Sequence, residues 1–137
     1  MVKIAPSMLS ADFARLQEEI KSVETSGADL LHIDIMDGHF VPNLTFGAPV
    51  IKALRAHTKL PFDVHLMVTN PADYVKTFAD IGTEYFTFHA EATPHMHRLV
   101  QEIKAHGMKR DFFESFYTGI NAGRYSVRFG HDINYER

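Results

Sequence analysis

Short apolar runs alternate with segments of helical periodicity along the first 109 residues of the chain. The runs are rich in β-prone residues and stand at 2–6, 30–35, 62–67 and 85–89. Between them, apolar residues recur three or four positions apart, which is the pattern of an amphipathic helix. These positions are Phe13, Leu16, Ile20 and Val23, then Val50, Ile51 and Leu54, then Tyr74, Val75 and Phe78, then Leu99, Val100 and Ile103. The pattern predicts four strands that alternate with four helices.

Residues typical of helix ends flank these segments. Asp12 can cap the first helix, and a proline stands in the expected first turn of each of the other three. Glycines follow the first, third and fourth segments, where a helix commonly ends in a left-handed residue. The prolines and glycines are Pro49, Pro71, Pro94, Gly27, Gly82 and Gly107.

The alternation of strands and helices predicts a parallel sheet with right-handed crossovers. Repeating units of roughly 25–30 residues suit either a (β/α) barrel or a doubly wound sheet. No GxGxxG motif follows the first strand, which argues against a dinucleotide-binding fold. We therefore expect an α/β fold of the TIM (β/α) barrel type, present as about four βα units with an irregular C-terminal tail. In such a barrel the carboxyl ends of the strands surround the active site.

Composition narrows the class of protein. The chain has 137 residues, of which 45% are hydrophobic and 23% charged, as in an ordinary globular protein. Its net charge of −3 gives no indication of a nucleic acid or membrane partner, and the absence of cysteine excludes disulfide and thiolate chemistry. No signal peptide or membrane-length apolar run is visible, so we expect a cytoplasmic location.

Polar residues interrupt two of the predicted strands in phase. Side chains alternate along a strand, so His32, Asp34 and Met36 share one face while the apolar residues between them share the other. In the strand at 62–67, His65 and Met67 alternate in the same way, with Asp63 in phase. The apolar face suits a helix layer, and the polar face is therefore expected to point into the barrel.

Two imidazoles and a carboxylate on neighbouring strands can converge on one ion. A mixed nitrogen and oxygen set suits one divalent cation such as Zn²⁺, Fe²⁺, Mn²⁺ or Co²⁺. A single strand histidine is more often a hydrogen-bonded core residue, but three polar residues in phase favour a metal or catalytic site formed by His32, Asp34 and His65. His89 and Glu91 are in phase on the fourth strand, where we expect them to support that site.

Four motifs resemble ribulose-phosphate 3-epimerases between residue 2 and Lys109. They read KIAPSMLSADF, HIDIMDGHFVPNLTFG, DVHLMV with NP one residue later, and FHAE. The resemblance implies a (β/α)₈ barrel of the pentose phosphate pathway, which interconverts ribulose 5-phosphate and xylulose 5-phosphate with one divalent metal. By position it implies His32, Asp34 and His65 as metal ligands. It also implies Asp34 as the acid/base that removes the C3 proton to form an enediolate.

The same resemblance implies the substrate contacts. Ser7 and His65 match residues that touch the pentose phosphate, and Met36 and Met67 match methionines around the enediolate. From pattern alone, the two methionines could equally be core filler, since thioethers adapt to irregular space.

The resemblance stops after Lys109. We therefore divide the chain into the N-terminal half of a ribulose-phosphate-binding barrel, 1–109, and a tail of uncertain structure, 110–137, which departs from the family. The family's second acid, which is also its fourth metal ligand, and its phosphate-binding glycines belong to later strands.

One hypothesis is that the tail is an out-of-frame translation of the epimerase gene. Codons for 113–119 read one base later can encode Leu-Asn-Pro-Phe-Thr-Pro, which matches the family's next motif, and those for 127–132 can encode Val-Leu-Asp-Met.

A truncated or frameshifted epimerase would have impaired activity, and two other functions stay open. The same motifs would serve a related sugar-phosphate 3-epimerase, such as one that acts on allulose 6-phosphate. A non-catalytic half-barrel could instead bind metal or assemble, because half a barrel leaves sheet edges that a second copy could cover.

Overall fold

The computed structural model describes residues 3–113, and side chains as far as Lys109. Four parallel strands alternate with four α-helices. The predicted strands at 30–35, 62–67 and 85–89 and the four predicted helices are confirmed, whereas the expected strand at 2–6 does not form in the described residues and a strand after the fourth helix was not predicted. The helices are α1 (Leu16–Thr25), α2 (Ala48–Arg55), α3 (Val75–Ile81) and α4 (Met96–Ala105). The strands are β1 (Leu31–Met36), β2 (Phe62–Met67), β3 (Tyr85–His89) and β4 (Lys109–Phe113).

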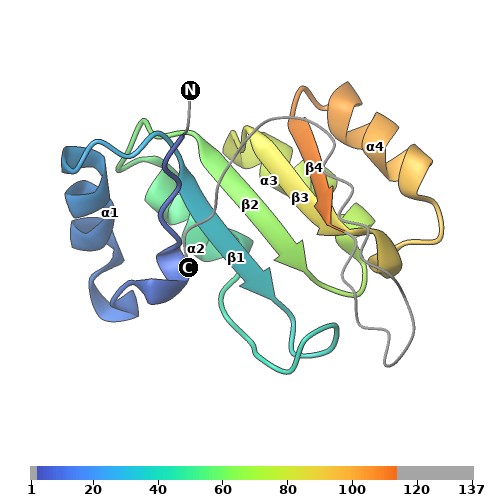
Figure 1. The fold of residues 1–137 in the computed structure, drawn as a ribbon, viewed down its shortest axis with the longest axis horizontal. Coiled ribbons are helices and arrows are strands. Elements are labelled where there is room, and N and C mark those ends of the chain that lie inside the picture. Colours follow the sequence, from blue (N-terminus) through green and yellow to red (C-terminus); the bar gives the residue numbers. More distant parts are fainter. Residues whose placement is uncertain (1–2, 114–137) are drawn as a thin grey trace.

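The order of the strands distinguishes a barrel from a doubly wound sheet. The sheet runs β1-β2-β3-β4, in the order of the chain, and α2 and α3 lie behind it in Figure 1. Right-handed crossovers that always step in one direction place their helices on the same face. A doubly wound sheet reverses direction at its switch point, and no reversal occurs among these strands. The described residues therefore form a partial (β/α) barrel unit, as expected.

The core fills the space between the sheet and its helices. Leu31, Ile33 and Ile35 are the apolar face of β1, and all three are buried. Ile51 of α2 and Phe78 of α3 are fully buried in the same cluster. The opposite face of β1 is consequently left for the polar residues that alternate with these three.

The described part of the expected strand at 2–6, residues 3–6, is extended but forms no continuous ladder with β1. Residues from Ile4 onward run beside β1, where the Leu30 amide donates to the Ile4 carbonyl at 3.2 Å and the His32 amide donates to the Pro6 carbonyl at 3.0 Å. Proline has no amide hydrogen to return a bond, so Pro6 interrupts the pairing. An isolated parallel bridge between Ser7 and His32 continues this pairing just beyond the expected strand.

The helix starts differ from the simplest expectation. Asp12 does cap a helical turn, its Oδ1 accepting from the Ala14 amide at 3.0 Å, but Phe13–Arg15 is a 3₁₀ turn and α1 begins at Leu16. Pro71 likewise opens a 3₁₀ turn, Pro71–Tyr74, ahead of α3. Gly82 ends α3 with a φ of 87°, a left-handed conformation that glycine adopts without strain.

The strand β4 extends beyond the last motif of the sequence. No strand period is visible in the residues after Lys109, yet Lys109–Phe113 pairs in parallel with β3. The expected irregular tail and its proposed shift of reading frame otherwise fall on residues 114–137, which lie outside those described.

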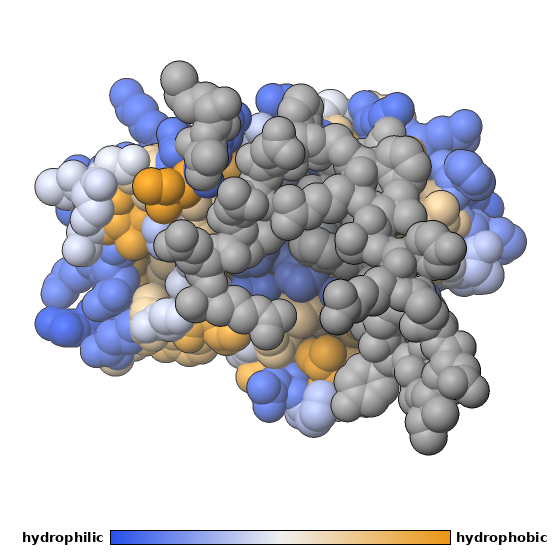
Figure 2. All heavy atoms as spheres, in the orientation of Figure 1, coloured by the Kyte–Doolittle hydropathy of each residue, from blue (hydrophilic) through white to orange (hydrophobic). Residues whose placement is uncertain are grey.

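Hydrophilic side chains dominate the flank of the molecule over α4 (Figure 2). In α4, Arg98, Gln101 and Lys104 are exposed while Leu99 and Ile103 are buried. This confirms the amphipathic pattern of that segment. No helix in the described part of the chain is both long and apolar enough to cross a membrane.

Candidate metal centre

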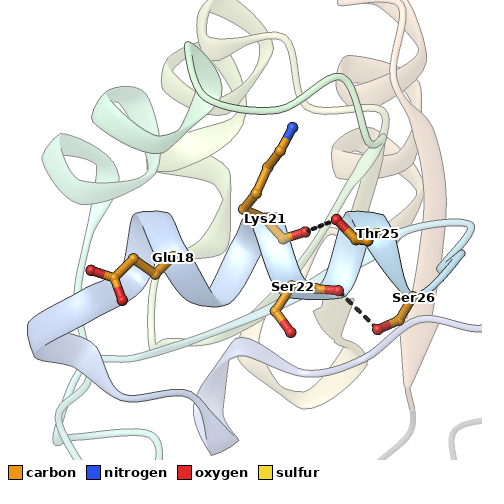
Figure 3. Close-up of a pocket in the computed structure, with 5 residues that line it drawn as sticks. All are labelled: Glu18, Lys21, Ser22, Thr25 and Ser26. Carbon is orange, nitrogen blue, oxygen red and sulfur yellow. Dashed lines mark hydrogen bonds between the residues drawn. The ribbon is translucent and has the colours of Figure 1, made fainter.

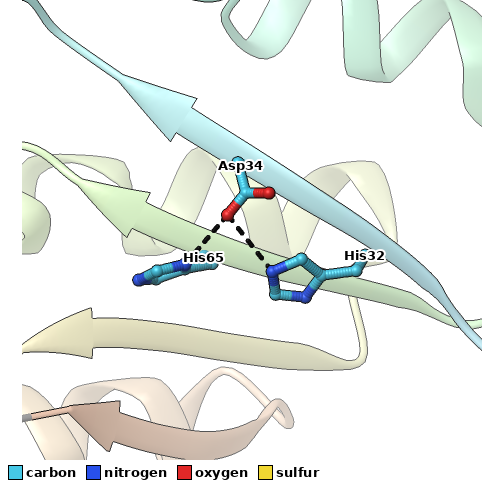
Figure 4. Close-up of side chains that lie close together, drawn as sticks. All are labelled: His32, Asp34 and His65. Carbon is cyan, nitrogen blue, oxygen red and sulfur yellow. Dashed lines mark hydrogen bonds and ion pairs between the residues drawn. The ribbon is translucent and has the colours of Figure 1, made fainter. Parts of the chain in front are cut away.

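Strand register brings the three predicted ligands together. Asp34 of β1 lies directly opposite His65 of β2, and His32 precedes Asp34 by two residues on the same face. Figure 4 shows one Asp34 oxygen, Oδ1, facing both imidazoles. His65 Nδ1 lies 2.9 Å from this oxygen and His32 Nε2 lies 3.2 Å from it. One donor atom from each residue falls within 4.8 Å of the other two.

Each imidazole has a second neighbour at its outer nitrogen. His32 Nδ1 lies 2.8 Å from Asp63 Oδ2, and His65 Nε2 lies 2.8 Å from His89 Nε2. The His65 and His89 rings are stacked with centroids 5.0 Å apart. A histidine that holds a metal commonly gives its other nitrogen to a partner, which fixes the ring.

The second oxygen of Asp34 is held from the other side. Ser7 Oγ donates a hydrogen bond to Asp34 Oδ2 at 2.7 Å. Thr45 Oγ1 donates to the Asp34 carbonyl at 3.0 Å and accepts from the Met36 amide at 3.0 Å, which ties the loop after β1 back to the strand. The carboxylate is therefore oriented by Ser7 and the two histidines, while Thr45 holds the backbone of the same residue.

The electrostatics of this cluster favour an anion between two imidazoles. Burial by itself would raise the pKa of Asp34, but hydrogen bonds from His32, His65 and Ser7 lower it well below its usual range. Burial would lower the pKa of His32, yet hydrogen bonds and charge from Asp34 and Asp63 raise it to about 9. Asp34 and Asp63 thus both favour the charged form of His32, and the two histidines favour the ionised form of Asp34.

This arrangement fits a divalent cation. Two imidazole nitrogens and one carboxylate oxygen are the donors of many Zn²⁺ and related sites, and here they come from two rigid strands. His32 is 6% exposed and Asp34 8% exposed, so water competes little for them. The partners at Asp63 and His89 leave the inner nitrogens directed at the common point.

The remaining predicted residues border the same region. Met36 and Met67 are opposite one another at the carboxyl ends of β1 and β2, and both are half-buried. Ser7 reaches the cluster from the segment that precedes α1. The structure therefore brings all six predicted site residues to one end of the sheet, while their contacts with a substrate stay a prediction.

Supporting residues are partly those expected. His89 does stack on His65, and burial followed by the nearby His65 lowers the pKa of His89 to about 4. Glu91, expected beside it, is exposed in the turn Ala90–Ala92. Asp63 was visible in the sequence only as a residue in phase with His65. Its pairing with His32 depends on strand register, which periodicity does not fix.

A shallow hollow lies elsewhere, along α1 (Figure 3). Its lining residues all come from this helix and its C-cap: Glu18, Lys21, Ser22, Thr25 and Ser26. The hydroxyls of Thr25 and Ser26 donate to the carbonyls of Lys21 and Ser22, each at 2.8 Å. These hydroxyls serve the helix end, and we assign the hollow no function.

Comparison with known proteins places the chain in a family. The model of the ribulose-phosphate 3 epimerase family matches residues 3–128. Ribulose-phosphate 3-epimerase of Bacillus subtilis (strain 168) is 56% identical over 109 residues, which cover 80% of this chain and 50% of the relative. The enzyme of Treponema pallidum (strain Nichols) is 55% identical over 106 residues, covering 77% and 49%.

A plant relative agrees with the bacterial ones. The cytoplasmic isoform of ribulose-phosphate 3-epimerase from Oryza sativa subsp. japonica is 60% identical over 108 residues, covering 78% of this chain and 47% of the relative. The chain thus spans about half the length of the curated relatives it matches. With its parallel sheet and its clustered His32, Asp34 and His65, the chain belongs to the ribulose-phosphate 3 epimerase family, whose members are isomerases with a TIM-barrel fold.

Proposed function

We propose that this chain supplies the metal site and one acid/base group of a ribulose-phosphate 3-epimerase, which interconverts ribulose 5-phosphate and xylulose 5-phosphate. The observation that carries the proposal is that the two carboxylate oxygens of Asp34 have different partners. Its Oδ1 faces two imidazoles, and its Oδ2 points to Ser7 instead. One oxygen can therefore join a metal site while the other stays available to a substrate.

One divalent ion would be held by His32 Nε2, Asp34 Oδ1 and His65 Nδ1. The mixed donor set suits Zn²⁺, Fe²⁺, Mn²⁺ or Co²⁺. Such an ion, when bound, polarises substrate oxygens and stabilises the negative charge that develops when a proton leaves the carbon beside a ketone.

Asp34 would act as the base. A carboxylate must be ionised to accept a proton, and the hydrogen bonds that lower the pKa of Asp34 keep it so. Oδ2 is the oxygen that lies outside the histidine cluster, and the Ser7 hydroxyl fixes the plane of the carboxylate. Ser7 and His65 border the same space and would contact the substrate, with Met36 and Met67 as an apolar wall beside the reacting carbon.

Epimerisation needs a second group, because the proton must return to the opposite face of a planar intermediate. In the family that group belongs to a strand later than those described. We therefore expect the present chain to exchange the C3 proton better than it inverts the carbon, with overall turnover well below that of a complete epimerase. Sequencing the gene tests the proposed shift of reading frame. A nucleotide sequence that does not encode Asn-Pro-x-Thr-Pro in the shifted frame would contradict it.

Solvent exchange tests the proposal directly. Metal-loaded protein is incubated with ribulose 5-phosphate in deuterium oxide, and NMR follows deuterium at C3 and the appearance of xylulose 5-phosphate. Deuterium incorporation that disappears in Asp34→Asn supports the role of Asp34. Metal binding without any exchange would instead support the non-catalytic half-barrel. The same assay on allulose 6-phosphate separates the related epimerase, which would exchange that substrate faster.

The proposal has two further parts, the location of the protein in the cell and its oligomeric state. A cytoplasmic location is tested by fractionation. Pairing of two copies through a sheet edge is tested by sedimentation equilibrium. A monomer at micromolar concentration would contradict the pairing.

A further inference from the structure

We infer that Asp63 is a positioning residue that fixes the His32 ring with Nδ1 protonated and Nε2 directed at the metal site. The inference rests on the proposed metal site and adds to it a residue that holds one ligand in place. Asp63 Oδ2 lies 2.8 Å from His32 Nδ1, and the two residues are opposite one another in the β1–β2 register. His32 is therefore held from the neighbouring strand.

The chemistry of the pair determines the tautomer. An ionised carboxylate only accepts hydrogen bonds, so the nitrogen that faces Asp63 must carry a proton. His32 Nε2 lies 3.2 Å from Asp34 Oδ1, so both ring nitrogens face carboxylates in this structure. A metal ion held by Asp34 and His32 would require the Nε2 lone pair, and the remaining proton would then lie on Nδ1, at the shorter contact with Asp63. Asp63 thus leaves a lone pair where a metal requires one, and it also sets the angle of the ring.

The burial of Asp63 indicates that this contact is specific. Asp63 is 1% exposed, in a sheet whose other buried side chains are mostly apolar. A buried carboxylate is unfavourable unless polar partners compensate for lost water. Thr87 Oγ1 of β3 donates to Asp63 Oδ1 at 3.5 Å, a long bond, whereas the contact with His32 is short. Of these two contacts, the one with His32 is the closer.

A structural alternative is that Asp63 merely links three strands through polar contacts. Two variants separate the alternatives. Asp63→Asn keeps the shape but allows the amide to face Nδ1 with either its oxygen or its NH₂ group, so the tautomer is no longer enforced. Thr87→Val, the matched control, removes the other described contact of Asp63 without touching His32.

Metal affinity is measured by competition of the full-length protein with a chromophoric chelator for Zn²⁺, and the absorption spectrum of the Co²⁺ form reports ligand geometry. Loss of a supporting partner typically lowers metal affinity about 10- to 100-fold. We expect that loss and a changed Co²⁺ spectrum in Asp63→Asn, and an affinity within about twofold of wild type in Thr87→Val. Equal affinities in all three proteins, with lower melting temperatures in both variants, would show a structural role and overturn the inference.

A measurement on the wild type does not depend on the folding of any variant. Long-range ¹H–¹⁵N NMR of histidine side chains distinguishes the two tautomers, and His32→Gln identifies the signal. In the Zn²⁺-loaded protein, we expect the His32 proton on Nδ1. A His32 ring protonated at Nε2 in that protein would overturn the inference. Failure of the wild type to bind Zn²⁺ or Co²⁺ would instead count against the proposed function.

Discussion

Ser7 and Asp34 are 27 positions apart in the chain, yet the Ser7 hydroxyl donates a hydrogen bond of 2.7 Å to Asp34 Oδ2. The other carboxylate oxygen, Oδ1, is the one that faces both imidazoles (Figure 4). Ser7 therefore acts on the oxygen proposed to take the proton, whereas the histidines act on the oxygen proposed to bind metal. The two functions of Asp34 can be separated by mutation.

Ser7→Ala should slow proton exchange while leaving metal binding nearly intact. A hydrogen bond to a charged group contributes about 1.5–3 kcal/mol, so we expect C3 exchange to fall roughly tenfold or more. The Kd for Zn²⁺ should change by less than about threefold, since no ligand atom is lost. Exchange by NMR and chelator competition measure the two effects. Ser10→Ala removes an exposed hydroxyl from the adjacent turn and should change neither.

Metal should stabilise the fold through His65. An ion that binds only the folded state at a free concentration 100 times its Kd stabilises by about 2.7 kcal/mol. Differential scanning calorimetry should show a higher Tm with Zn²⁺ than with chelator in the wild type, and no such difference in His65→Gln. His57→Gln, at an exposed position, should keep the full effect. An equal response in the two variants would argue that Zn²⁺ binds elsewhere.

Acid should destabilise the loops above the sheet through Asp37. Its Oδ1 accepts from the amides of His39 and Phe40, and its Oδ2 accepts from the amide and hydroxyl of Thr69. Desolvation opposes these bonds, but they lower the pKa of Asp37 to about 2.

A folded-state pKa below the ordinary value means that ionised Asp37 stabilises the fold. This contribution is complete above the ordinary carboxyl pKa, about 4, and is lost as pH falls toward 2. The Tm measured between those values should therefore fall less steeply in Asp37→Asn than in the wild type. Parallel curves for the two proteins would contradict this role.

Phe78→Ala should destabilise the helix layer strongly. Phe78 is fully buried, with its ring edge-on to Phe86 at a centroid distance of 6.4 Å. Truncation of a buried phenylalanine costs about 3–5 kcal/mol, because a cavity remains. Urea denaturation measures the loss. Leu44→Ala, at a site that is 77% exposed, should stay within about 0.5 kcal/mol of wild type.

Periodicity was sufficient to predict the four helices, three of the four strands and the face of the sheet that carries the chemistry, but it missed β4 and placed a strand at 2–6. The alternation at His32, Asp34 and Met36 needs only the geometry of one strand, so it could be read directly. The contacts of Asp63 with His32 and of Ser7 with Asp34 could not, because they depend on the offset between strands and on the path of an extended segment. Pro6 and the 3₁₀ turn at Phe13–Arg15 show the same limit locally, since backbone pairing there departs from what residue preference alone suggests.

The extended segment beside β1 makes the two edges of the sheet different. Because residues 4–6 accept hydrogen bonds from Leu30 and His32, they occupy the edge of β1, and a further strand on that side would have to pair with residues 4–6 and not with β1. Within the described residues, β4 is then the edge with no further partner strand. During synthesis, residues 4–6 and β1 leave the ribosome first. Each later strand can then be added at the opposite side of the sheet, in the order of synthesis. For an engineer, a grafted strand belongs after β4, and an N-terminal fusion must leave residues 4–6 able to reach β1.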